Sequence, residues 1–266
     1  MAIDYTIDFP CPPKEEFGTE SILERLKGRE RAESIIALFR ESGDNRPPSE
    51  MGFEFTRRTP EGDEETRIIV VQDLLDGAEA LTPYQSYCEF CPVNHAGRPF
   101  GCMDFVQYPI SAQAENWLLD QLPVPDELLI WMLLRQVIRE FKYDGSLVES
   151  LRDENGTFFE SPEVFVRMLG KFRVNSNQVF EMLFGRRQHI LPRQAALLLL
   201  FTNSINRELE ADQIQALDPP PENADDLHPF IWTVHPDDDA SILQIKAFLL
   251  ALHTAWKFNV NLLIDA

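Results

Sequence analysis

Basic residues are scarce in this chain of 266 residues. It has 24 Lys and Arg against 44 Asp and Glu, a formal net charge of −20. Charge of that sign repels nucleic-acid phosphates and anionic membrane surfaces. The composition therefore predicts no nucleic-acid and no membrane partner, and it favours a protein partner. Ten of the acids and no Lys or Arg lie in residues 208–240, so the negative charge is concentrated there.

Long apolar runs are also missing. The longest, residues 128–134 and 195–201, are far shorter than the ~20 residues that a membrane span needs. The opening MAIDYTIDFP has neither the basic start nor the apolar run of a secretory leader. We therefore expect a cytoplasmic protein in a reducing environment, where disulfides are uncommon.

The common catalytic motifs are absent as well. The sequence contains no P-loop, no G-x-G-x-x-G, no G-x-S-x-G and no H-E-x-x-H. It also lacks the zinc deaminase pattern, since Glu89 lies between two cysteines. These absences remove the most common nucleotide-dependent enzymes and hydrolases, and they leave open whether the chain is an enzyme.

Cysteine is rare too, but its placement is informative. Of four cysteines, three fall in the segment YCEFCPVNHAGRPFGC, where Cys88, Cys91 and Cys102 have the spacing C-x2-C-x10-C. The fourth, Cys11, lies upstream in the Pro-rich turn FPCPP. Two thiolates separated by two residues can bind one metal ion through a tight turn. We therefore predict a metal site with Cys88, Cys91, Cys102 and Cys11 as ligands.

Two ligand sets are open for this site. Cys11 would complete four thiolates, whereas His95, inside the same segment, would give three thiolates and one imidazole. Tetrahedral zinc accepts either set, with Zn–S bonds of ~2.3 Å, while a 4Fe-4S cluster prefers four thiolates. The sequence thus predicts a structural zinc site, with a 4Fe-4S cluster as the alternative cofactor. Thiols without a metal, including a redox pair at Cys88 and Cys91, are a third interpretation.

Two metal-binding patterns resemble short parts of this segment. The spacing C-x2-C-x3-H-x6-C resembles in part the retroviral-type zinc knuckle, although both later gaps differ. The stretch CEFCPV resembles the CxxCPV stretch of the WhiB-like iron–sulfur regulators, although the next cysteine follows at a longer interval. The first resemblance implies zinc and the second an iron–sulfur cluster. Each covers at most sixteen residues, so neither establishes a family.

Hydrophobic periodicity predicts an α+β protein, in which a small antiparallel sheet with the cysteine-rich loop packs on a larger, mainly helical part. The last strand is expected beside the first. The expected strands are residues 3–9, 53–55, 67–71, 103–108 and 261–264, with a turn at 60–65. The expected helices are residues 20–40, 74–81, 112–121, 127–143, 161–169, 175–184, 192–208 and 239–257.

The expected organisation is a sheet-containing part at residues 1–110 and a helical part at 111–266, together one compact unit. The helical part includes an acidic, Pro-rich loop at 209–237. Ser111, Asp126 and either Asp238 or Asp239 are the expected helix N-caps. The stretch HPDDD that contains these last two acids offers carboxylates to a hard cation, but acids at a helix start also complement its dipole, and this second interpretation is favoured.

Together these features favour a metal-binding protein with a structural zinc site and a binding or regulatory role toward an unknown target. The first alternative is an iron–sulfur protein that senses redox state or transfers electrons. The second is a metal-dependent enzyme of unknown reaction, which would use the metal as a Lewis acid through an open coordination position.

Overall fold

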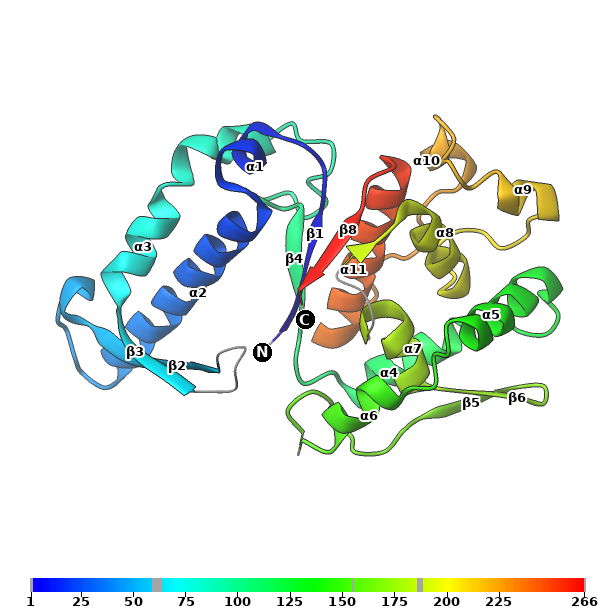
Figure 1. The fold of residues 1–266 in the computed structure, drawn as a ribbon, viewed down its shortest axis with the longest axis horizontal. Coiled ribbons are helices and arrows are strands. Elements are labelled where there is room, and N and C mark those ends of the chain that lie inside the picture. The colour runs from blue at the N-terminus through cyan, green and yellow to red at the C-terminus, as the bar shows by residue number, and fades with distance from the viewer. Residues whose placement is uncertain (1, 59–63, 155, 186–188, 266) are drawn as a thin grey trace. The chain divides into compact units, whose positions relative to one another are not determined.

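The computed structural model describes residues 2–58, 64–154, 156–185 and 189–265 (Figure 1). It combines helices with small antiparallel sheets, so the predicted α+β class is confirmed. Within those residues, no helix is both long and apolar enough to cross a membrane. The chain forms two compact units, a large unit of Met1–Phe9 with Pro92–Ala266 and a small unit of Pro10–Cys91.

The four-stranded sheet of the large unit joins both ends of the chain. Its strands are β1 (Ala2–Ile7), β4 (Met103–Gln107), β8 (Leu262–Asp265) and β7 (His189–Ile190), in the order β4-β1-β8-β7 with antiparallel neighbours. Tyr5 lies opposite Ile264, which confirms the predicted pairing of the last strand with the first. Because β1 lies between β4 and β8, the first residues belong to the large unit.

The helices of the large unit are arranged around one long buried helix, α11 (Ala240–Lys257). It packs on β1, β4 and β8, and it buries Phe248, Leu252 and Trp256. The other helices are α4 (Ala112–Asp120), α5 (Leu128–Glu140), α6 (Ser146–Arg152), α7 (Ser176–Phe180) with a π-helical continuation at Glu181–Gly185, α8 (Pro192–Phe201), α9 (Ala211–Gln215) and α10 (Ala224–Leu227).

Several predicted helix ends are confirmed, and others are wrong. Ser111 caps α4 and Asp239 caps α11, each by accepting a hydrogen bond from a backbone N–H in the first turn. Asp126 is not a cap, because α5 begins after Glu127. The predicted helix at residues 161–169 is not present. Val166–Leu169 instead form β5, which pairs with β6 (Phe172–Asn175) in a hairpin. Gly170, with a φ of 66°, provides the left-handed residue that the turn needs.

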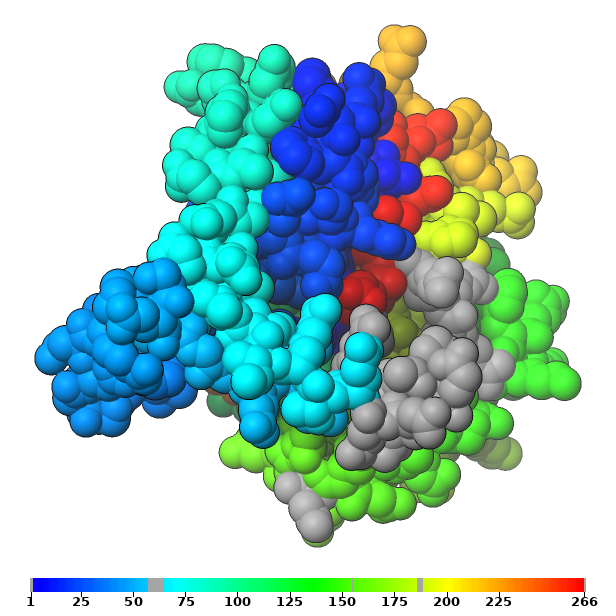
Figure 2. Space-filling view, turned by 60° about the vertical axis from the view of Figure 1, so that its left-hand side comes forward, coloured from blue at the N-terminus to red at the C-terminus, as the bar shows by residue number. Residues whose placement is uncertain are grey.

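The small unit is a helical pair with a hairpin. Its elements are α1 (Pro12–Phe17), α2 (Thr19–Glu41), the 3₁₀ turn η1 (Pro48–Glu50), β2 (Gly52–Arg58), β3 (Glu64–Val70), α3 (Val71–Glu79) and the 3₁₀ turn η2 (Thr82–Cys88). The predicted hairpin is confirmed, and its turn at residues 60–65 lies mostly outside the described residues. The segment that follows α2 protrudes from the surface of this unit, in light blue at the left of Figure 2.

The core of the small unit forms where α2 meets α3. Gly28 of α2 lies against Leu74 of α3, and the Arg25 guanidinium donates a hydrogen bond to the Gly77 carbonyl at 2.6 Å. Ala32, Met51 and Val71 form the buried centre. The partly buried side chains around them are Ile35, Ile36, Phe39, Phe53, Leu74 and Leu75.

Candidate functional site

Three of the four predicted thiol ligands belong to the small unit. Cys88 ends η2, and the backbone N–H of Cys91 donates to the Cys88 carbonyl at 3.4 Å, so the C-x2-C pair forms a tight turn. Cys11 precedes α1, and its carbonyl accepts the Lys14 N–H at 3.0 Å. α1 packs on η2. All three side chains are partly exposed.

The other two candidate ligands, Cys102 and His95, belong to the large unit. Cys102 is buried just before β4, and its carbonyl accepts the Ile7 N–H at 2.9 Å. The His95 ring stacks on Tyr5, with 6.0 Å between ring centroids. Neither His95 ring nitrogen has a hydrogen-bond partner of normal geometry, and the Tyr5 hydroxyl has none either.

The environment of His95 favours its neutral form. Burial lowers the pKa of His95, while the negative charge of Asp104 acts in the opposite direction and only partly offsets it. A neutral imidazole is the form of histidine that binds metals.

The structure thus divides the predicted ligands into two sets. Cys11, Cys88 and Cys91 are in one unit, and His95 and Cys102 are in the other. Nowhere in the described part of the chain do three or more His, Cys, Asp or Glu side chains form a group that could hold a metal ion. The tight turn at the C-x2-C pair is therefore the part of the predicted site that the structure contains.

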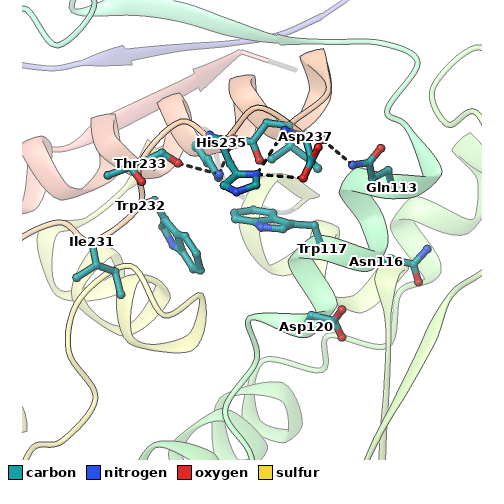
Figure 3. Close-up of a pocket in the computed structure, with 12 residues that line it drawn as sticks. Gln113, Asn116, Trp117, Asp120, Ile231, Trp232, Thr233, His235 and Asp237 are labelled. Atoms are coloured by element: carbon teal, nitrogen blue, oxygen red, sulfur yellow. Dashed lines mark hydrogen bonds and ion pairs between the residues drawn. The ribbon is translucent and has the colours of Figure 1, made fainter.

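A second candidate site is a pocket of about 740 Å³ in the large unit (Figure 3). One wall is a face of α4 on which Gln113, Asn116, Trp117 and Asp120 recur at helical spacing. The opposite wall comes from residues 231–238 and the first turns of α11. The pocket therefore lies between two elements that are far apart in the sequence.

Two tryptophans form an aromatic corner in this pocket. The rings of Trp117 and Trp232 meet edge to face, with centroids 5.1 Å apart and an interplanar angle of 68°. The Trp232 indole N–H donates to the Thr202 carbonyl at 3.2 Å, which fixes the orientation of that ring. The Lys246 ammonium lies 5.4 Å from the Trp117 centroid and 5.8 Å from the Trp232 centroid. The corner already holds one cation–π contact.

The three acids of HPDDD have different partners beside this corner. Asp239 accepts the Ile242 N–H at 2.8 Å and caps α11, as the dipole interpretation predicts. Asp238 accepts a hydrogen bond from the Lys246 ammonium at 2.6 Å, and Asp237 lies 3.4 Å from the His235 ring. Burial opposes ionisation of Asp238, but hydrogen bonds from Lys246 and the His235 backbone N–H outweigh it, and the pKa of Asp238 is lowered.

Sequence reasoning did not identify the two tryptophans as site residues. Trp117 and the polar residues beside it are typical of the outer face of an amphipathic helix, which gives no sign of a binding pocket. Trp232 lies in a Pro-rich, acidic stretch with no clear periodicity. The corner exists only because the fold brings α4 next to the segment before α11.

Comparison of the chain with models of known protein families, with curated proteins and with solved structures found no match.

Proposed function

We propose that this protein binds a structural zinc ion and has a binding or regulatory role. The ligands are the thiolates of Cys88, Cys91, Cys102 and Cys11, with His95 as the alternative fourth ligand. The tight turn between Cys88 and Cys91 carries the proposal. Such a turn allows two thiolates to reach one tetrahedral metal ion.

The two candidates for the fourth position have different support. Buried ring nitrogens without partners cost about 1–3 kcal/mol each, and a metal bond to one nitrogen of His95 would remove part of that cost. Cys11 is supported by the packing of α1 on η2, since both elements adjoin thiols of the small unit. The variants Cys11→Ser and His95→Ala therefore distinguish between the two candidates.

Zinc is favoured over the iron–sulfur alternative by the aromatic side chains next to the C-x2-C pair. A cluster depends on its apolar shell to limit solvent access. Phe90 is 86% exposed and Tyr87 is 53% exposed, so neither ring is buried around the thiols. A metal-dependent enzyme, the remaining alternative, would require a coordination position without a protein ligand.

The proposal includes a location and a partner. A site built from cysteine thiolates suits a reducing compartment, and we propose the cytoplasm. The partner is a protein with a basic surface, because residues 208–240 carry ten acids and no Lys or Arg. Neither nucleic acid nor a membrane is part of the proposal.

The test is metal analysis of protein purified without oxygen, compared across variants. The proposal predicts one zinc per chain and its loss in Cys91→Ser. Loss in Cys11→Ser with retention in His95→Ala assigns the fourth position to Cys11, and the reverse result assigns it to His95. His189→Ala, which changes another histidine of the large unit, is the control and should keep its zinc.

Two outcomes contradict the zinc proposal. A brown preparation absorbing near ~400 nm, as expected for thiolate-ligated iron–sulfur centres, would favour the cluster alternative. Wild-type protein without stoichiometric metal, or full metal retention in Cys91→Ser, would remove this metal site altogether.

A further inference from the structure

The tryptophan pocket carries more negative than positive charge. The ionisable side chains lining it are three aspartates, one lysine and one histidine. With histidine counted as neutral, one positive charge against three negative charges leaves a net charge of −2. Asp238 and Lys246 form an ion pair at 2.6 Å and compensate each other. The uncompensated charge therefore belongs to Asp120 and Asp237.

The pocket also offers hydrogen-bond acceptors. Asn116 donates its side-chain N–H to the Ala112 carbonyl at 2.8 Å, and Gln113 donates to the Asp237 carbonyl at 2.9 Å. Both amides thereby commit a donor to the protein and keep their side-chain oxygens as acceptors. The carboxylate of Asp120 accepts as well. These acceptors and the net negative charge favour a ligand that supplies donors, positive charge, or both.

Lys246 shows which ligand chemistry the aromatic corner accommodates. Its ammonium lies over both tryptophan rings and donates to the Thr233 carbonyl at 2.9 Å as well as to Asp238. A positively charged amine is thus held by aromatic faces on one side and by oxygen acceptors on the other. Figure 3 shows Asp120 on the same helix as Trp117, beside the open space in front of the two rings.

We infer that this pocket binds an organic cation of the alkylammonium class. The apolar part of the ligand packs against Trp117 and Trp232, and its charged nitrogen lies toward Asp120. Aromatic rings with a nearby carboxylate bind ammonium ions by cation–π and charge attraction. The Trp232–Thr202 hydrogen bond and the Lys246–Asp238 ion pair fix the corner before any ligand arrives. This site shares no residue with the proposed metal site.

The test is a calorimetric titration of the full chain with choline, and with 3,3-dimethylbutan-1-ol as the uncharged compound of the same shape. Tryptophan fluorescence follows the same titration. We expect choline to bind at least about tenfold more tightly than the alcohol, since a desolvated cation–π contact contributes up to ~2 kcal/mol. Trp117→Leu should abolish this preference, with an unfolding curve to show that the variant is folded.

A charge-matched pair of variants separates the pocket from the overall acidity of the chain. Asp120→Asn should weaken choline binding about fivefold or more, as expected for a lost charge-assisted contact of ~1 kcal/mol. Glu149→Gln removes an exposed acid of α6 that does not line the pocket, and should change choline binding less than about twofold. Asp120 is exposed, so its variant should fold normally.

Three results would overturn the inference. They are the absence of choline binding, equal binding of choline and the alcohol, and equal weakening by Asp120→Asn and Glu149→Gln. None of these results depends on whether the cysteines hold a metal.

Discussion

The large and small units differ in how much apolar surface they bury. In the large unit, α11 alone buries Phe248, Leu249, Leu252 and Trp256 at or near zero exposure. In the described part of the small unit, the buried apolar residues are Ile22, Ala32, Met51, Val71, Ala78 and Leu81. A small core gives little surplus over the entropy cost of folding. We therefore expect the small unit to gain more than the large unit from a further source of stability.

The proposed metal site would supply such a source. Three of its thiols, Cys11, Cys88 and Cys91, lie at the two ends of the small unit, next to α1 and η2. A metal that joins the first and last segments of a short chain region closes it, and binding energy then adds directly to folding energy. The unit with the smaller core is thus the unit that contains three of the four cysteines. Four predictions test this difference between the two units, from the largest expected effect to the smallest.

Metal removal should affect the two units differently. A structural zinc site contributes on the order of 10 kcal/mol in small metal-binding domains, so a strong zinc chelator should unfold the small unit. Hydrogen exchange should increase through α1, α2 and α3, while α11 stays protected. All four tryptophans lie in the large unit, so their fluorescence should stay nearly constant. Equal hydrogen exchange in α1, α2 and α3 with and without chelator would contradict the expected difference between the two units.

Loss of a buried arginine should destabilise the large unit alone. The Arg152 guanidinium pairs with Glu115, and both side chains are almost completely buried. It also donates to Asn177, Ser176 and two backbone carbonyls, and it lies 4.1 Å from the Phe159 ring centroid. Arg152→Met leaves the Glu115 carboxylate without its partner and should cost about 3–5 kcal/mol in urea unfolding followed by tryptophan fluorescence.

The control for that variant replaces both partners. Burial raises the pKa of Glu115, against the attraction of Arg152, so the carboxylate is costly once Arg152 is gone. The double variant Glu115→Leu, Arg152→Met removes the charge as well and should recover most of the lost stability. A single-variant effect below about 1 kcal/mol would show that the ion pair does not hold this unit together.

Acid should also weaken the large unit. Burial lowers the pKa of His253 below its ordinary 6.5, opposed by its hydrogen bond to the His228 carbonyl and by Asp225, while Lys257 lowers it further. Burial and the neighbouring His253 likewise lower the pKa of His228. The unfolded chain therefore takes up these protons first as the pH falls.

The consequence is stability that is fully present above pH 6.5 and lost as the pH falls toward the folded pKa values. The slope is at most about 1.4 kcal/mol per pH unit for each histidine. His253→Gln should reduce this slope in unfolding experiments between pH 7 and pH 5. A wild-type free energy of unfolding that is constant over this interval would contradict the assignment.

A single methyl group should strengthen the small unit. Gly28 lies inside α2, and a Cβ there would be 3.5 Å from Leu74 Cδ2, an ordinary contact. Gly28→Ala should therefore raise stability by about 0.5–1 kcal/mol, the helix-propensity difference. Gly43→Ala is the matched control and should lower stability by about 1 kcal/mol, because the φ of Gly43 is +84°. Both stability changes are measured as shifts in the melting temperature of the small unit, which hydrogen exchange monitors.

Local signals in the sequence predicted much of the fold. Ser111 and Asp239 are caps because their short side chains accept backbone hydrogen bonds wherever a helix begins. Residues 262–265 form a strand as their apolar character predicts. The helix predicted at residues 161–169 failed because Ser161 and Pro162 resemble a helix start, while the hairpin there depends on Gly170 and on pairing with residues 172–175.

The two candidate sites differ in how much of each one the sequence predicts. Spacing predicts the thiol pair, since Cys88 and Cys91 are close along the chain, but it does not determine whether Cys11 or His95 joins them. The aromatic corner depends on contact between Trp117 and Trp232, which only the fold creates. No local pattern encodes such a contact, so sequence reasoning could not find it.

The most direct measurement of the central claim is the zinc and thiol content of anaerobically purified wild-type chain. Our account predicts a colourless protein with one zinc per chain, whose thiols react with a thiol reagent only after a chelator is added. Under the alternative ligand set with His95, one thiol, Cys11, reacts before the chelator and the other three only afterwards. Four thiols that react at once, in protein without stoichiometric metal, would contradict the account.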